Sequence, residues 1–211
     1  MLNAEKILEL AEANDFESIA ELAKKAIIEA SAKAAGGTTL LNRTRAALKY
    51  LKDNAKEGRH VWAGTTWTEE GKQCFVNNCT AFALVKPLEG LPVATGAANA
   101  QHMNVLPCFP NGSDYVTAAV NIADVTAQLK IWKAQHSGRH AQPCFYDVGM
   151  SRYNAQYLLD CYNILGGKIV FKVPPRGELS PAIMESENGK AILLPVRIKD
   201  EELAEKQRAA C

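Results

Sequence analysis

The sequence lacks long apolar runs, a secretory leader and any marked excess of charge. No apolar segment approaches the roughly 20 residues of a transmembrane helix, and the opening MLNAEKILELAEAN does not have the pattern of a secretory signal. We therefore expect a cytoplasmic protein with no membrane partner. The formal net charge is +1, and a value so close to zero neither favours nor excludes nucleic acid as a ligand.

The motifs of common cofactor and nucleophile sites are also missing. The chain contains no P-loop, no GxGxxG sequence and no nucleophile elbow. Its six cysteines include no CxxC pair, so in the cytoplasm we expect free thiols, several of them as small core residues. We predict that the protein is not an enzyme and that it has no catalytic residues, no metal and no cofactor.

One spacing of residues suggests a metal site or a thiol enzyme. His136, His140 and Cys144 lie four residues apart, but Gly138 and Pro143 prevent a regular helix from aligning them. A zinc site also requires four ligands that converge tetrahedrally. A metal or thiol enzyme is therefore a third alternative, which metal analysis of the purified protein would reveal.

The length of 211 residues suits one substantial domain or two small ones. Charge is distributed unevenly along the chain. Residues 1–35 are net acidic, whereas the next helical segment, 41–59, is net basic. Clustered positive charge is what a phosphate-binding face requires. The basic segment is therefore a candidate nucleic-acid surface.

Residues 3–14 and 16–35 are predicted to form two helices separated near Asn14-Asp15. Apolar residues recur at helical spacing in the second helix, and Asp15 is a candidate N-cap residue. Gly36-Gly37 is expected to end this helix. The resulting hairpin is either an added packing or oligomerisation element or a partner-binding arm.

A further helix is predicted over residues 41–57. It carries an apolar stripe that would pack on a sheet, and its cations recur every three or four residues in a second stripe beside the first. The cations suit phosphate contacts, which do not depend on base sequence. Alternatively, they form a solvated face whose lysines cover the edge of the core. The apolar stripe consists of Thr44, Ala47, Leu48, Leu51 and Ala55, and the cationic stripe of Arg45, Lys49, Lys52 and Lys56.

The middle of the chain is predicted to contain strands and a long connection. Two strands, His60–Thr68 and Gln73–Lys86, are expected on either side of a turn at Glu69-Glu70-Gly71-Lys72. Residues 87–114 are rich in proline, glycine, alanine and asparagine, which predicts a connection between two sub-units. A loop of this length is either ordered by packing or a mobile flap.

Tyr115–Asn121 is predicted as a strand that leads into a helix at Ile122–Gln135. The apolar residues of this helix recur at helical spacing, and Lys130 and Lys133 lie beside them. The cations of helix 41–57 have the same offset from their apolar stripe. This repetition favours one shared cationic surface.

The stretch from Tyr146 to Ile198 shows the clearest order of elements. It predicts a short strand, an amphipathic helix that ends at Gly166-Gly167, and three strands with a turn at Glu187-Asn188-Gly189 before the last one. The three strands are Lys168–Val173, Ser180–Glu185 and Ala191–Ile198.

This stretch resembles the C-terminal domain of the bacterial DNA polymerase III beta subunit, the sliding clamp family. The resemblance is carried by Tyr157-Leu158-Leu159-Asp160, by Leu179-Ser180-Pro181-Ala182-Ile183 and by Leu194-Pro195-Val196-Arg197-Ile198. It implies an α+β, DNA-clamp-like fold in which helices pack on antiparallel sheets built from β-α-β-β-β units, here with an extra N-terminal helical hairpin. The expected organisation is a helical hairpin at 1–37, a first clamp-like unit at 38–90, a connecting loop at 91–114, a C-terminal clamp-like unit at 115–198 and a charged tail at 199–211.

The resemblance also implies a function, that of a shortened, non-enzymatic clamp-like protein similar to a DNA polymerase processivity factor. Its expected partners are duplex DNA, a peptide of a DNA polymerase or another replication protein, and further copies of itself in a homo-oligomer. The alternative is a structural or protein-interaction module with a clamp-derived fold that does not bind DNA. The DNA-binding residues would be Arg43, Arg45, Lys49, Lys52, Lys56, Lys130 and Lys133, and the hydrophobic peptide groove would be formed by Ile192, Leu194, Pro195, Val196, Arg197 and Ile198.

Overall fold

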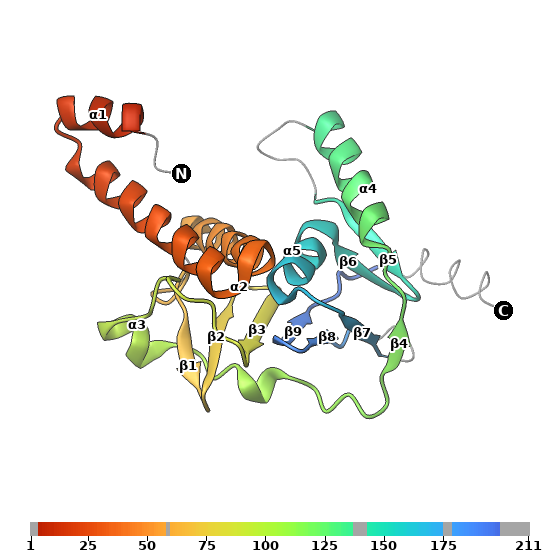
Figure 1. Ribbon diagram of the computed structural model, residues 1–211. Coiled ribbons are helices and arrows are strands. Elements are labelled where there is room, and N and C mark those ends of the chain that lie inside the picture. Colours follow the sequence, from red (N-terminus) through yellow and green to blue (C-terminus); the bar gives the residue numbers. More distant parts are fainter. Residues whose placement is uncertain (1–3, 58–59, 137–142, 175–178, 199–211) are drawn as a thin grey trace.

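The protein is an α+β protein, as predicted (Figure 1). The computed structural model describes residues 4–57, 60–136, 143–174 and 179–198, with the backbone alone at 4, 25, 28–29, 31–38 and 57. Within these residues, no helix combines the length and the apolar content that a membrane span needs. In chain order, the elements are α1 (Ala4–Glu12), α2 (Phe16–Glu57), β1 (Trp67–Glu69), β2 (Lys72–Val76), β3 (Thr80–Leu84), α3 (Gly96–Gln101), the 3-10 helix η1 (Leu106–Cys108), β4 (Val116–Ala118), α4 (Ile122–Gln135), β5 (Phe145–Val148), β6 (Ser151–Asn154), α5 (Ala155–Leu165), β7 (Val170–Val173), β8 (Ala182–Ser186) and β9 (Gly189–Leu193).

Seven of these strands form one sheet in the order β1-β2-β3-β9-β8-β7-β4, and β5 and β6 form a separate two-stranded sheet. All pairings between the named strands of the larger sheet are antiparallel. At its centre β3 pairs with β9, and Phe82 lies opposite Ala191. Strands from the two predicted clamp-like units are therefore continuous in one sheet.

The two halves of this sheet share one order of elements. Helix α2 is followed by β1, β2 and β3, and helix α5 is followed by β7, β8 and β9. Within each set of three, neighbouring strands pair in sequence order. Six of the seven strands thus come from a helix-and-three-strand unit used twice, with the third strand of each unit at the centre, and β4 adds the seventh strand beside β7.

Side chains alternate between the two faces of the sheet, and helices cover one of these faces. Phe75, Phe82 and Phe171 lie on that face and belong to the larger core cluster, together with residues of α2, α4 and α5. Figure 1 shows α5 between α2 and α4, and α5 contacts both of them. This helical layer carries the candidate site.

The opposite face of the sheet is covered by the chain that follows β3. Ile183 and Ile192 of the sheet share a second core cluster with Ala94 and Val105 from that segment. The segment also forms α3 and η1, and Figure 1 shows it running along the sheet towards β4. The predicted connection over residues 87–114 is therefore ordered by packing against the sheet and is not a mobile flap.

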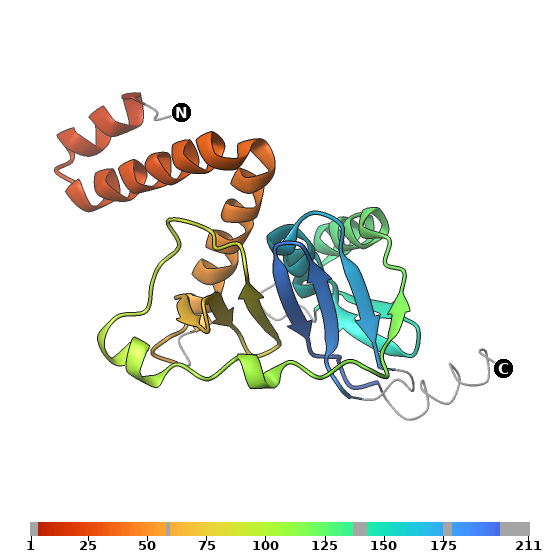
Figure 2. The ribbon, with the colours of Figure 1, turned by 60° about the horizontal axis from the view of Figure 1, so that its bottom comes forward.

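Helix α1 and the first part of α2 extend away from the body of the protein (Figures 1 and 2). They break where predicted, since Asn14 adopts a positive φ of 57° and the N–H of Ser18 donates to Asp15 Oδ1 at 3.1 Å. Hydrogen bonds from Ser18 stabilise the carboxylate and hold the pKa of Asp15 below its usual range. Asp15 therefore acts as the N-cap residue of α2.

The prediction that Gly36-Gly37 ends the second helix is wrong, because α2 continues to Glu57. Figure 2 shows a sharp bend in the middle of α2 instead. Glycine lowers helix propensity by about 1 kcal/mol relative to alanine, and pairs of small residues are frequent sites of kinks. The helix can continue past Gly36 and Gly37 because its later residues, including Ala47 and Leu51, are buried in the core.

Two strand predictions are also wrong in extent. The single strand expected over Gln73–Lys86 is the β2–β3 hairpin, because the side chain of Asn77 stabilises a turn within it. Asn77 Oδ1 accepts the N–H groups of Cys79 at 2.8 Å and Thr80 at 2.7 Å. The strand expected from His60 begins only at Trp67.

The predicted order of the C-terminal unit is confirmed. Helix α5 ends at Leu165 with Gly166 as its C-cap residue, at φ +60°, and β7, β8 and β9 follow as an antiparallel set. The short strand expected near Tyr146 is β5, and it pairs with β6, which the sequence did not reveal. Strand β9 ends at Leu193, before the predicted Ile198.

Candidate nucleic-acid interface

The predicted cations, apart from Arg43, are exposed on the two outer helices of the helical layer. They form two stripes, one on each side of α5, and α5 itself contains no lysine or arginine. The stripe on α2 consists of Arg45, Lys49, Lys52 and Lys56, and that on α4 of Lys130 and Lys133.

Arg43 does not belong to this surface, so this part of the prediction is wrong. Its side chain is only 5% exposed, and its Nε donates to the carbonyl oxygen of Ile164 at 2.8 Å. The guanidinium therefore satisfies an unpaired carbonyl at the C-terminal end of α5. Burial lowers the pKa of Arg43, and the nearby carboxylate of Glu187 offsets part of this effect.

One lysine from each stripe lines the same pocket. This pocket, which we call the α2–α5 pocket, has a volume of about 310 Å³, and both Lys49 of α2 and Lys133 of α4 line it. Polar side chains of α5, Gln156 and Asp160, form the wall between these lysines. Asp53 of α2 also lines the pocket, so the lining contains two lysines and two aspartates.

Hydrogen bonds connect the cation of α4 to the carboxylate of α5. Lys133 Nζ donates to Gln156 Oε1 at 2.7 Å, and Gln156 Nε2 donates to Asp160 Oδ1 at 2.8 Å. Burial raises the pKa of Asp160, although the bond from Gln156 and the charges of Lys49 and Lys133 partly oppose this. The negative charge of Asp53 on α2 acts in the same direction as burial, so the partly buried Asp160 carboxylate lies near a second carboxylate as well as near the two lysines.

The floor of the pocket is fixed by a second set of hydrogen bonds. The hydroxyl of Tyr50 lies 2.6 Å from that of Thr80, and Thr80 Oγ1 donates to Asn77 Oδ1 at 2.9 Å. Asn54 Nδ2 donates to the carbonyl oxygen of Val76 at 2.7 Å. These bonds fix the amide groups of Asn54 and Asn77, both of which line the pocket.

The sequence analysis missed Gln156, Asp160 and Asn77 as members of the site. Gln156 and Asp160 lie at i and i+4 on the polar side of α5, so helical spacing could have paired them with each other. No sequence pattern relates them to Lys49, which is more than 100 residues away in the chain. Their meeting depends on the packing of α2 against α5.

One of the six residues of the predicted peptide groove is buried. Ile192 is 6% exposed and belongs to the core cluster under the sheet, so its prediction is wrong: alternation along β9 directs it inward. Leu194 is 41% exposed, and Pro195, Val196, Arg197 and Ile198 follow as exposed or half-buried residues. The Val196 N–H donates to the Arg152 carbonyl oxygen at 2.7 Å, which ties this segment to β6. The tail 199–211 lies outside the described residues.

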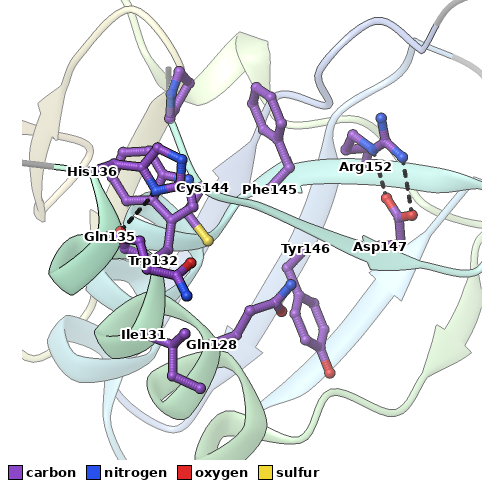
Figure 3. A pocket seen from close by; sticks show the side chains of 11 residues that line it. Gln128, Ile131, Trp132, Gln135, His136, Cys144, Phe145, Tyr146, Asp147 and Arg152 are labelled. Carbon is purple, nitrogen blue, oxygen red and sulfur yellow. Dashed lines mark hydrogen bonds and ion pairs between the residues drawn. The ribbon is translucent and has the colours of Figure 1, made fainter. Parts of the chain in front are cut away.

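A larger concave surface lies between α4 and β5 (Figure 3). It contains two residues of the metal hypothesis, His136 and Cys144, whereas His140 lies outside the described residues. His136 stacks on Trp132 with ring centroids 4.7 Å apart, and burial raises the pKa of the Cys144 thiol. Among the residues with described positions, no three histidine, cysteine or acidic side chains gather as a metal site.

Comparison of the chain with protein-family models, with curated proteins and with solved structures finds no match.

Proposed function

We propose that this protein is a clamp-like, non-enzymatic DNA-associated protein that contacts the phosphates of duplex DNA through the cations of α2 and α4. The observation that carries the proposal is that Lys49 and Lys133, more than 80 residues apart in sequence, line one pocket in the helical layer. The residues proposed to contact DNA are Arg45, Lys49, Lys52, Lys56, Lys130 and Lys133.

The physical basis is the distribution of charge. Cations on the outer helices of a single layer can reach successive phosphates of a duplex, and such contacts act additively and independently of base sequence. Lys52 and Lys130 are exposed on the two stripes. The sequence resemblance to sliding clamps and the twofold use of a helix-and-three-strand unit support the same function.

Binding to duplex DNA at increasing salt concentration tests this proposal. The logarithm of the association constant should fall linearly with the logarithm of salt concentration, with a slope of about −0.9 for each phosphate contacted. In the double variant Lys49→Gln/Lys52→Gln, binding should weaken uniformly across DNA sequences, and the magnitude of the slope should decrease by about 2.

A matched double variant, Lys86→Gln/Lys190→Gln, removes the same charge outside the helical layer. Lys190 lies two residues before Ile192 on β9, so both side chains point to the same face of the sheet, the one opposite the helices. The affinity of this double variant for duplex DNA, and the slope of its salt dependence, should equal those of the unmodified protein. Equal losses in the two double variants would show that α2 is not the DNA-binding surface.

Residues 4–42, which we call the N-terminal arm, favour the second candidate function, a protein-interaction module that does not bind DNA. None of the described side chains between Glu5 and Asn42 is buried, and Leu8, Phe16 and Ile27 are more than 60% exposed. Helices whose apolar side chains are not covered by their own chain can pack against another protein. Absence of duplex binding at low salt would favour this second function over the first.

A further inference from the structure

The α2–α5 pocket differs from the surface around it in shape and in chemistry. At about 310 Å³, it is at the lower end of the range for small-molecule sites and has room for roughly ten water molecules at liquid density. A single phosphate or chloride ion would leave most of this space unfilled. The volume therefore suits a ligand of several rings or functional groups.

The walls offer both donors and acceptors of hydrogen bonds. The ammonium groups of Lys49 and Lys133 can donate to an anionic group, and the carboxylate of Asp160 can accept from N–H groups. A bare anion would gain from the lysines but would be repelled by Asp160 and by Asp53, a second carboxylate that lines the pocket. A ligand with an anionic part and a part rich in N–H groups satisfies both.

An aromatic side chain completes the lining. Tyr157 is half-buried on α5 and lines the pocket beside Gln156. Phenol rings provide a surface on which nucleobases stack, and such stacking tolerates any base. Ammonium, carboxylate, amide and phenol groups thus surround one hollow within the surface proposed to contact phosphates.

We propose that the α2–α5 pocket binds a single unpaired nucleotide of a DNA strand whose neighbouring phosphates are held by the cations of α2 and α4. This inference rests on the proposed function. Lys49 and Lys133 would contact the phosphate of that nucleotide, while Asp160 and Gln156 bind the polar edge of its base. The protein would therefore prefer DNA with an unpaired nucleotide to a perfect duplex.

Gln156 has a central role in this arrangement, because it is hydrogen-bonded to both Lys133 and Asp160. An amide offers one donor and one acceptor group, so it can exchange these internal bonds for bonds to a base. Gln156→Ala removes this group and leaves all the lysines in place. Recognition of the unpaired nucleotide should suffer while general phosphate contact remains.

Fluorescence anisotropy with three labelled duplexes tests the inference. They are a perfect duplex, the same duplex with one extra unpaired nucleotide, and a third in which that nucleotide lacks its base. The duplex with the unpaired nucleotide should bind about tenfold more tightly than the other two, a ratio in keeping with the stacking of one base. Gln156→Ala should abolish this preference.

Lys52→Gln is the matched control, because Lys52 is an exposed cation of the same helix that does not line the pocket. It should weaken binding of all three duplexes equally and keep the tenfold ratio. Equal affinity of the unmodified protein for the three duplexes, with salt dependence intact, would overturn the nucleotide pocket and leave the proposed function standing. Tight binding of the baseless duplex would show recognition of a flexible backbone instead and would also overturn the inference. Absence of binding to every duplex would overturn both.

Discussion

At the scale of single residues, Asp160 combines burial with charge in a way that makes stability depend on pH. Burial raises the pKa of its carboxyl group in the folded protein. The folded state therefore holds this proton up to a higher pH than the unfolded state does. As pH rises from the usual aspartate pKa of about 4 through the raised value, ionisation of Asp160 lowers the stability of the folded protein.

Asp160→Asn should remove this pH-dependent cost. The amide oxygen of asparagine can still accept the hydrogen bond from Gln156 Nε2. The variant should unfold at a higher urea concentration than the unmodified protein at pH 7, and the difference should vanish below about pH 4. A variant less stable than the unmodified protein at pH 7 would contradict a raised pKa for Asp160.

At the scale of elements, the two parts of α2 contribute to stability in different ways. The first part belongs to the arm, where Ile27 is 65% exposed, and the second part lies in the core, where Leu51 is 1% exposed. Removing a buried leucine side chain costs about 2–5 kcal/mol in the free energy of unfolding. Removing an exposed side chain changes it by less than about 0.5 kcal/mol.

Leu51→Ala and Ile27→Ala therefore form a matched pair within one helix. Urea denaturation should show a loss of about 3 kcal/mol for Leu51→Ala and almost no change for Ile27→Ala. A comparable loss for Ile27→Ala would mean that the arm is packed against another surface in solution, and dilution of the protein would then reduce the difference.

At the scale of the whole molecule, the continuous sheet should make the protein unfold as one unit. The pair β3–β9 joins strands from the two predicted sub-units, and the larger core cluster contains residues from both. Separating the sub-units would expose the centre of the sheet and leave without partners the backbone groups through which β3 and β9 pair with each other. We therefore expect a single cooperative transition.

Cys74 on β2 and Cys161 on α5 can report on this cooperativity, because both are 0% exposed and lie in different sub-units. Pulsed thiol labelling in increasing urea, followed by mass spectrometry of the peptides, should give the same midpoint for both cysteines. Labelling of Cys74 at a clearly lower urea concentration would show that the N-terminal strands unfold independently.

Local patterns in the sequence predicted much of the secondary structure. The helix over Ile122–Gln135 has the predicted bounds, and Asp15 and Gly166 act at helix ends as expected. Such signals depend on near neighbours in the chain. The prediction that Gly36-Gly37 ends a helix was wrong because the low helix propensity of glycine was outweighed by the burial of Leu51 and other residues further along α2.

The sequence by itself determined which helices carry cations and that three strands follow helix α5, because these features follow from helical and alternating periodicity. Only the tertiary structure decided that Arg43 is buried, that Ile192 faces a covered side of the sheet, and that Lys49 and Lys133 meet at one pocket with Asp160. The reason is that periodicity assigns a residue to a face of its own element, whereas the partner of that face depends on how distant elements pack.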